Sequence, residues 1–528
     1  MRKNIVRFIL PLVFTLVIYY FMLPPINLSA PEFWIFIFIV GMFTLVAWAT
    51  SELKLSTLIN NRRITKSRKN LIIFGSISVI ILAIILINLF NMPLFNSKSY
   101  YERIKINEAG DFTKDVKPVD FNKLALLDKD SSSKLGDRVM GQMTDLVSQF
   151  SVSNLYTQIN YKDDIIRVTP LEYAGLIKYF TNRKNGVEGY ITVNSVTGES
   201  KLVRLEKGMK YMPSSMFFEN LYRKLRLSNP TTIFGEVSFE LDEEGNPFWI
   251  AQTLKYSGIG LKPEVNGIVM LNPITGESKK YAVKDVPTWV DHVYSANLII
   301  EQVDDWGKYK NGFFNSIFGQ KNVVKTTRGY NYLALNDDIY LYTGITSVAA
   351  DQSNVGFILT NLRTKETSFY GVSGAEEYSA MASAQGAVQQ MKYTATFPLL
   401  INLDNKPTYL LSLKDNAGLV KMYAFVDYVD YQKVVVTDAS QGIMQAAQNY
   451  LGGSITTGDN LTKDIIISSI KDVVIDGTTY YYFKEDKDIY RSSIKVNQNL
   501  LPFVTVGDKV NITYKKAEVN EITKISKN

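Results

Sequence analysis

The 528-residue chain contains no cysteine and only one histidine, His292. Disulfides, paired-histidine zinc sites and cysteine nucleophiles are therefore excluded, and a Ser-His-Asp triad would have to use His292. The sequence also lacks a Gly-x-Ser-x-Gly elbow, a phosphate-binding Gly-rich loop followed by Lys-Ser/Thr, and an Asp-rich calcium loop. Apolar and aromatic neighbours indicate that His292 is an ordinary strand or turn residue. We expect no metal, no cofactor and no enzymatic activity.

The remaining reactive side chains form no recognisable catalytic set. Ser131 and Lys134 have the spacing of a Ser/Lys nucleophile pair, but they lie in a polar segment. Adjacent acidic residues are frequent, yet neighbours on a strand point to opposite faces, whereas a glycosidase needs two carboxylates facing each other across a cleft. These acidic doublets are Asp163-Asp164, Glu243-Glu244, Asp304-Asp305, Asp337-Asp338 and Glu376-Glu377. An enzyme acting on wall polymer remains the weakest of our alternatives.

Acidic residues are scarce at the N-terminus. Residues 1–95 carry 9 of the 58 basic residues but only two of the 51 acidic ones, Glu32 and Glu52. The other residues, 96–528, hold 49 of each sign and are neutral overall. The net charge of +7 therefore belongs to the N-terminal segment and does not indicate nucleic-acid binding.

Three long apolar runs occupy this N-terminal segment, at residues 5–23, 33–50 and 71–95. Each has about the 18–20 residues that a helix needs to cross roughly 30 Å of hydrocarbon. No ionisable residue lies at mid-bilayer depth in these runs, which is typical of an anchor and not of a transport pathway. We therefore predict three transmembrane helices in contact with membrane lipid.

The loops between the runs predict the orientation. The loop 51–70 is rich in basic residues, whereas the loop 24–32 has neither Lys nor Arg. Because short basic loops stay in the cytoplasm, we expect a cytoplasmic N-terminus and an extracytoplasmic 96–528. The residues that set this topology are Arg62, Arg63, Lys66, Arg68 and Lys69.

The first run has a second interpretation, as a cleaved signal peptide. Leu28-Ser29-Ala30 resembles a cleavage site, although Pro31 directly after it argues against cleavage. In both interpretations the C-terminal part is exported. An exported region without cysteine must rely on core burial for stability, and it suits the single-membrane envelope of a Gram-positive bacterium.

An internal repeat is the most informative feature of the exported region. A frame of Gly, Asn five residues later, Thr eight later and Glu ten later begins at Gly189, Gly267 and Gly356. Each copy predicts a β-hairpin with an Asn-x-x-Thr-Gly turn, in which Gly adopts positive φ. Lys365 replaces that Gly in the third copy, and the segment from Gly418 is a degenerate fourth candidate. Repeated small α+β modules, each a helix on an antiparallel sheet, are expected.

Local patterns predict further elements around these hairpins. Residues 96–135 are polar and predict a tether, followed by a helix over 139–150 and a short strand over 165–168. Thr169-Pro170-Leu171-Glu172 has the pattern of a capping box and predicts a helix that ends near Gly186. The small residues of 376–391 predict a helix that packs closely within the fold or at a contact with a second copy.

The Thr-Gly-Glu hairpins resemble PepSY-type modules, which have a cystatin-like helix-on-sheet plan. With the basic three-span anchor, the chain is similar to membrane proteins of Firmicutes that have no assigned biochemical role. PepSY modules imply extracytoplasmic binding and, in some cases, regulation of a protease. The resemblance extends over residues 155–450 in pieces and is carried by a short turn motif.

The C-terminal part differs from the repeats. Short strand candidates and an Asp476-Gly477 turn predict a small OB-like or SH3-like barrel. Its five expected strands are 465–470, 472–475, 480–484, 489–496 and 509–514. Aromatic and basic residues of an OB barrel can bind nucleic acid, but the acidic neighbours and extracytoplasmic location make us expect none.

One segment combines aromatic residues with glycines, from Trp306 to Gln320. Because aromatic residues are enriched at the centres of interfaces, it is our candidate interaction surface, with packing within the fold as the alternative. The residues of this surface are Trp306, Tyr309, Phe313, Phe314 and Phe318.

The predicted organisation follows in chain order: transmembrane helices 1–95, a tether 96–135, α+β modules 136–260, 261–350 and 351–455, and a small barrel 465–528. We expect a membrane-anchored scaffold or binding protein of a bacterial envelope assembly, with an envelope protein as partner. A PepSY-like regulator or inhibitor of an extracytoplasmic protease is the first alternative, and a homo-oligomer is left open.

Overall fold

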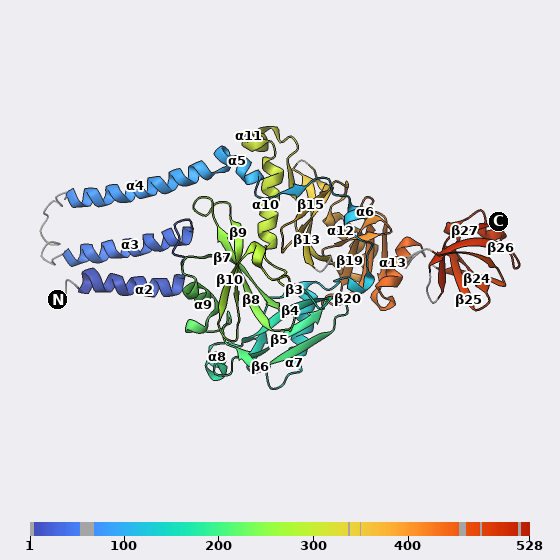
Figure 1. The fold of residues 1–528 in the computed structure, drawn as a ribbon, viewed down its shortest axis with the longest axis horizontal. Coiled ribbons are helices and arrows are strands. Elements are labelled where there is room, and N and C mark those ends of the chain that lie inside the picture. The colour runs from blue at the N-terminus through green and yellow to red at the C-terminus, as the bar shows by residue number, and fades with distance from the viewer. Residues whose placement is uncertain are drawn as a thin grey trace. The chain divides into compact units, whose positions relative to one another are not determined.

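A computed structural model describes residues 5–52, 68–335, 338–348, 350–452, 461–475, 478–515 and 519–527 (Figure 1). The chain divides into two compact units, each considered by itself. The first contains Met1–Asp111 and Lys123–Glu376, and the second contains Phe112–Asn122 and Glu377–Asn528.

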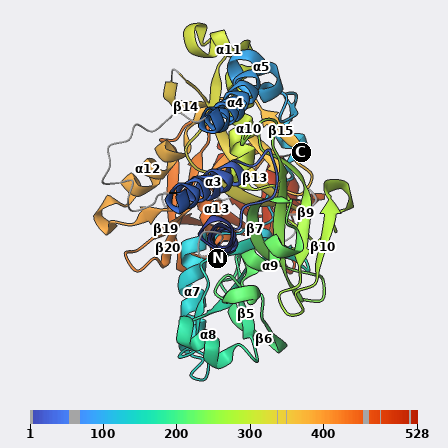
Figure 2. The same ribbon diagram turned by 90° about the vertical axis from the view of Figure 1, so that its left-hand side faces the viewer.

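Apolar helices leave the first unit on one side (Figures 1 and 2). They are α2 (Leu10–Met22), α3 (Pro31–Glu52) and α4 (Arg68–Asn91), the last followed by α5 (Pro93–Tyr101). Helices α2 and α3 lie side by side, with the rings of Phe14 and Phe43 stacked at 3.7 Å. In the described part of the chain, one helix has the length and apolarity to cross a membrane by itself, over Pro31–Trp48. The three-span prediction is thus shown only to the extent of this one N-terminal apolar helix.

The other two predicted spans have a different form. The end of α4 and α5 together pass the same test, but as a pair bent by 50°, and the helical stretch Arg7–Met22 is shorter. Most of the basic loop lies outside the described residues, including Arg62, Arg63 and Lys66, as do the side chains of Arg68 and Lys69.

In the part of the chain that the structure describes, four sheets with predominantly antiparallel pairing follow, where three modules are predicted. The first contains β2 (Phe150–Val152), β3 (Thr157–Tyr161), β4 (Asp164–Tyr173), β5 (Val187–Asn194) and β6 (Ser200–Met209). The second contains β7 (Ile233–Leu241), β8 (Pro247–Lys255), β9 (Glu264–Leu271) and β10 (Ser278–Ala282). The third contains β11 (Val324–Thr326), β12 (Asn331–Leu335), β13 (Asp338–Ser347), β14 (Ala350–Asn361), β15 (Thr367–Tyr370) and β16 (Gly374–Ala375), with β1 (Ile106–Asn107) parallel to β15. The fourth contains β17 (Thr394–Ala395), β18 (Leu399–Leu403), β19 (Lys406–Lys414), β20 (Val420–Asp427) and β21 (Val434–Asp438).

A helix precedes each sheet in the chain, so one plan recurs four times: a helix and then two consecutive hairpins. These helices are α7 (Lys129–Gly141), α9 (Leu221–Ser228), α10 (Ala296–Tyr309) and α12 (Glu377–Ala387). The small residues of α12 allow close packing on its own sheet, where Ala380 and Ala384 are fully buried. Shorter helices are α6 (Phe112–Asp115), α8 (Leu176–Asn182), α11 (Gly312–Phe314) and α13 (Ile443–Leu451).

The second sheet is buried on both faces. Trp249, Ala251 and the alternating residues of β9 pack into a core shared with the first sheet. Ile250, between them in sequence, points the other way, into a core shared with the third sheet. Because side chains alternate along a strand, the continuous apolar runs of β8 and β9 serve two cores. We call each helix with the sheet that follows it a module. The first three modules, which begin with α7, α9 and α10, therefore form one packed body.

The repeat frame forms the same turn in every copy. The Asn194 Oδ1 atom accepts the backbone N–H groups of Val196 and Thr197, each at 2.9 Å. Asn272 and Asn361 accept the equivalent pairs at 2.8–3.1 Å. Asp427 does the same toward Val429 and Asp430, at 2.9 and 3.0 Å. An acceptor side chain that fixes the turn thus defines four copies, the fourth with Asp in place of Asn.

Lys365 occupies the glycine position of the third turn with φ of +68°. A left-handed backbone costs a non-glycine residue about 1 kcal/mol or more. The side chain compensates, because its Nζ donates to the Arg103 carbonyl at 2.7 Å and to Glu264 Oε2 at 2.9 Å. The same turn therefore persists with a different residue at the glycine position.

Several predicted elements are wrong in place or type. Thr169–Glu172 belongs to strand β4, not to a helix, because both faces of β4 are covered and Thr169 Oγ1 donates to the Ser153 carbonyl at 2.8 Å. The helix predicted over 139–150 instead runs over Lys129–Gly141, capped by Asp128, which accepts Ser131 N–H at 2.9 Å.

The expected tether 96–135 is structured over much of its length. It contains α5, β1, α6 and the start of α7, and it buries Arg103, Ile104 and Phe112. Its central part, Phe112–Asn122, belongs to the second unit, where Val119 N–H donates to the Asn402 carbonyl at 2.9 Å. Buried side chains at wide spacing, without helical or strand periodicity, explain why the pattern suggested a linker.

The C-terminal residues form a half-barrel sheet with strand order β22-β26-β27-β25-β24-β23. Its strands are β22 (Leu461–Ile466), β23 (Ser469–Ile475), β24 (Thr478–Glu485), β25 (Asp488–Ser493), β26 (Lys509–Lys515) and β27 (Asn520–Lys527). Ile475 pairs with Thr478 on either side of the predicted Asp476-Gly477 turn, which itself lies outside the described residues. The sequence prediction missed β27, whose core residues Ile522 and Ile525 are three apart, because a register shift interrupts the period-two alternation.

Candidate binding cleft

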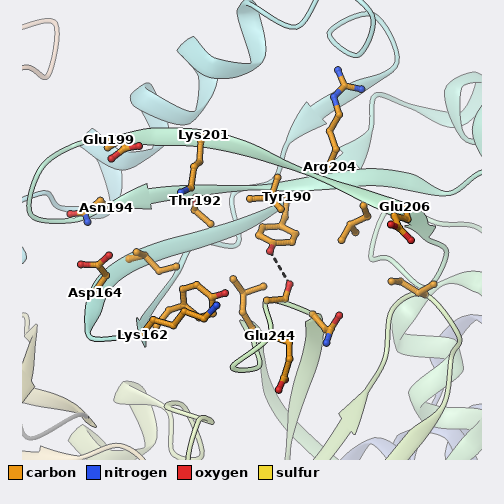
Figure 3. Close-up of a pocket in the computed structure, with 18 of the residues that line it drawn as sticks. Lys162, Asp164, Tyr190, Thr192, Asn194, Glu199, Lys201, Arg204, Glu206 and Glu244 are labelled. Atoms are coloured by element: carbon orange, nitrogen blue, oxygen red, sulfur yellow. Dashed lines mark hydrogen bonds between the residues drawn. The ribbon is translucent and has the colours of Figure 1, made fainter.

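A cleft of about 710 Å³ opens between the first sheet and the β7–β8 turn (Figure 3). Its floor is apolar and includes Ile166, Val203 and Leu241. Strand β5 contributes Tyr190 and Thr192, which lie on the opposite face of the strand from the fully buried Ile191 and Val193. The period-two alternation of the first repeat hairpin therefore places these side chains in the cleft.

Two tight turns bring charged groups to its rim. Lys162 and Asp163 adopt φ of +53° and +66° in the β3–β4 turn, as a two-residue hairpin of the primed type requires. This turn places Lys162 and Asp164 at one side of the cleft, and the β7–β8 turn places Glu244 at another (Figure 3).

The rim carries both signs of charge. Its acidic residues are Asp164, Glu199, Glu206 and Glu244, and its lysines are Lys162, Lys201 and Lys207. Among the described residues, none of these seven side chains forms an ion pair with another. Arg204 also borders the cleft, but its guanidinium points away and pairs with Asp145 at 2.7 Å (Figure 3). The unpaired groups are available to a ligand that itself carries both signs.

Tyr190 joins the two modules at the base of the cleft. Its hydroxyl donates to the Gly245 carbonyl at 2.8 Å, and burial raises the pKa of the phenol to about 12. The hydroxyl therefore stays protonated and acts as a hydrogen-bond donor, not as a base, near neutral pH. Strand β6 is an edge strand of the first sheet, where its partner among the described strands is β5, and it runs along the same cleft.

The predicted interaction surface separates into two groups. Trp306 and Tyr309 are buried at 5% and 7% exposure on the inner face of α10, with Phe313 half-buried. Phe314 and Phe318 are exposed at 65% and 80% on the turn that follows. Only these last two residues, with Ile317, present a surface.

His292 has a structural environment. Its Nε2 lies 2.7 Å from the Gln158 carbonyl, and its ring meets Tyr332 edge to face at 5.7 Å. It therefore connects the first and third sheets. In the described part of the chain, no group of three His, Asp or Glu side chains could hold a metal ion.

The acidic doublets of the sequence are the signal that could have located the cleft. Asp164 and Glu244 each belong to such a doublet, and the expectation that neighbours on a strand diverge argued against a shared site. Both doublets instead lie in or beside tight hairpin turns, where one member of each reaches the rim. Only the packing of the first module against the second brings the two turns together.

Comparisons with known proteins add little. No protein-family model matches the chain, and no curated protein matches it. Among solved structures, a crystal structure of an ACO/RPE65 chimera is similar at 11% identity, with a TM-score of 0.13. The match covers 52% of this chain and 46% of that one. The chain therefore spans about half of that structure, and the match carries no argument about fold or function.

Proposed function

We propose that this chain is a membrane-anchored, extracytoplasmic binding protein of a bacterial envelope assembly, without catalytic activity. Its first and second modules hold a segment of a partner protein in the cleft. The observation that carries the proposal is the cleft itself: an apolar floor, a rim of unpaired charges of both signs and an open strand edge. A polypeptide segment offers the matching groups, since it has apolar side chains, charges of both signs and a backbone that can pair with β6.

The anchor in this proposal consists of three spans, with residues 1–95 in the membrane and 96–528 outside. The exposed apolar side chains of α2 and α3, such as Leu16 and Phe38, suit a lipid environment. Retention of the first helix is supported at the alternative cleavage site. Ala30 is completely buried, and the Ser29 carbonyl accepts Gly260 N–H at 3.0 Å.

The second module also holds the end of α2. Arg226 Nε donates to the Leu23 carbonyl at 2.9 Å, and the Arg223 guanidinium lies 4.2 Å from the Tyr20 ring centroid. Cations stabilise the C-terminal end of a helix, where carbonyls lack partners. These bonds favour a cleft held at a fixed height above the membrane.

Photo-crosslinking from the cleft tests the proposal. The photoreactive amino acid p-benzoylphenylalanine would replace Lys201, which lines the cleft, in the full chain in its native membrane. Lys279 is the matched control, because it has the same place in the second repeat hairpin but lies outside the cleft, over the Tyr281 ring at 4.8 Å. We expect one abundant adduct from position 201 that is absent from position 279. Equal patterns from the two positions would contradict the proposal.

The identity of the adduct separates the variants of this function. An envelope structural protein supports the scaffold function. A protease, with cleavage that changes when the chain is deleted, supports the PepSY-like regulator, and an adduct with a second copy indicates a homo-oligomer. If instead Asp164→Asn abolished turnover of wall polymer by a folded protein, the weakest proposal, a wall-polymer enzyme, would replace binding.

A further inference from the structure

Five large apolar side chains form an exposed patch on the first module, which we call the α8 patch. Its residues are Leu176, Ile177 and Phe180 of α8, and Phe217 and Phe218 of the 3₁₀ turn Phe217–Glu219. Ile177 and Phe218 are exposed at 76% and 66%. Contiguous apolar side chains of this size are unusual on a surface that faces only water.

The protein holds this patch outward. The rings of Phe180 and Phe217 lie 6.1 Å apart, and the Tyr179 hydroxyl donates to Glu219 Oε2 at 2.7 Å, which ties α8 to the turn. Phe217 has φ of +52°, a left-handed backbone that bulky residues rarely adopt. Strain of this kind persists where the surroundings fix the conformation, and it often accompanies a functional contact.

The α8 patch lies beside the C-terminal end of α2. Phe218 meets Tyr20, near the C-terminal end of α2, at 6.2 Å edge to face. In Figure 2, which looks from the side on which the helices leave, α8 lies on the near face with α9. If α2 crosses the membrane, the patch lies at the height where its span ends.

The charges around the α8 patch suit a contact with the membrane surface. The basic residues Arg183 and Lys184 follow α8, and Arg223 and Lys224 follow the turn. Glu219, the acidic residue within the patch, is paired with Arg183 at 3.6 Å and bonded to Tyr179. An apolar surface with a basic rim is the composition of an interfacial membrane contact, where apolar groups enter the acyl boundary and cations meet anionic headgroups.

We propose that the α8 patch inserts into the outer leaflet of the membrane, as a second attachment beside the transmembrane helices. This inference rests on the proposed membrane anchor. With attachments at both α2 and α8, the first module cannot rotate freely about the helices, so the cleft keeps one orientation to the bilayer.

The absence of cysteine allows a direct test. Single cysteines at Ile177 and Phe218 would carry a nitroxide label in the full chain, reconstituted into vesicles of phosphatidylethanolamine and phosphatidylglycerol. Paramagnetic resonance compares accessibility to oxygen, which concentrates in lipid, and to a water-soluble nickel complex. Thr197→Cys is the control, because Thr197 is exposed in the turn after β5. Helix α8 precedes the start of this strand, whose length is about 25 Å. Val46→Cys on α3 reports the anchor itself.

We expect the labels at 177 and 218 to favour oxygen, as the label at 46 does, and the label at 197 to favour nickel. If only 46 favours oxygen, the α8 patch is solvated and the inference is wrong while the anchor stands. If 46 also favours nickel, the proposed anchor fails. Protection of 177 and 218 from both reagents would show a protein surface there and would also contradict insertion.

Discussion

At the scale of single residues, buried charge gives the sharpest expectation. Glu521 is 5% exposed in the half-barrel, where Arg491 Nε donates to its Oε2 at 2.7 Å. Among the described residues, its Oε1 has no hydrogen-bond partner. Burial raises the pKa of the Glu521 carboxyl from 4.5 to about 7, despite the opposing effect of Arg491. The folded state therefore favours the protonated acid.

Since the pKa is higher in the folded state than in the unfolded state, stability is lost as the pH rises. The half-barrel should lose up to about 3 kcal/mol of unfolding free energy between about pH 4.5 and pH 7, with no further change above. Glu521→Gln should remove this slope. Urea unfolding at several pH values measures the dependence of the unfolding free energy on pH. A fluorophore attached to Phe503→Cys reports the unfolding of the half-barrel.

The control for this prediction is Glu485→Gln in the same sheet. The Glu485 carboxylate accepts a hydrogen bond from Lys463 Nζ at 2.7 Å. Glu485 pairs with Asp488 of β25, three residues before Arg491. This variant should retain the slope. A half-barrel whose stability rises with pH, or an unchanged slope in Glu521→Gln, would contradict the account.

Residue roles were only partly predictable from the sequence. Ile299, Val303 and Trp306 follow one another at intervals of four and three residues. This spacing places them on one face of a helix and is typical of a buried face. The aromatic density of the segment obscured this pattern. Phe314 and Phe318 follow the end of α10, where the periodicity stops, and these are the exposed pair.

At the scale of elements, the repeated turn provides a matched pair of substitutions. Gly198 and Gly276 have the same place in two copies, with φ of +76° and +75°. An added Cβ at Gly198 would lie 3.5 Å from Leu127, an ordinary contact, whereas at Gly276 it would lie 2.3 Å from the Tyr211 ring. Gly198→Ala should cost about 1 kcal/mol through the backbone alone.

Gly276→Ala should cost about 1–3 kcal/mol more, because the ring or the turn must move. Urea unfolding of the two variants measures the difference. Tyr211→Leu combined with Gly276→Ala should recover part of it. Equal costs at the two glycines would show that the Tyr211 contact is not as described.

Secondary-structure elements were predicted correctly where hydrogen bonds between nearby residues stabilise them. The prediction failed where contacts with distant parts of the chain select the secondary structure. The Asn-x-x-Thr turns are stabilised by bonds within a few residues, so the frame alone predicts the hairpins. Thr169–Glu172 has a helix-capping pattern, but it pairs with β2 and β5 on either side and becomes strand. The residues that pair with Thr169–Glu172 are 16 or more positions away in sequence. A pattern of four consecutive residues contains no information about them.

At the scale of the whole molecule, the sequence indicated repetition but not how the repeats pack. The run Phe248–Ala251 is continuously apolar, a pattern of strands buried on both faces. The second module forms such a sheet between two cores, which the sequence analysis did not predict. The cleft between modules depends on that packing and has no counterpart in any single repeat.

The central claim is that 96–528 faces the outside of a membrane and carries the cleft there. Because the chain has no cysteine, Thr197→Cys beside the cleft and Ser67→Cys in the basic loop can each be probed in intact cells with a membrane-impermeant thiol reagent. The account predicts that position 197 reacts in intact cells and position 67 reacts only after permeabilisation. Reaction at 67 with protection at 197, reversed on permeabilisation, would contradict it.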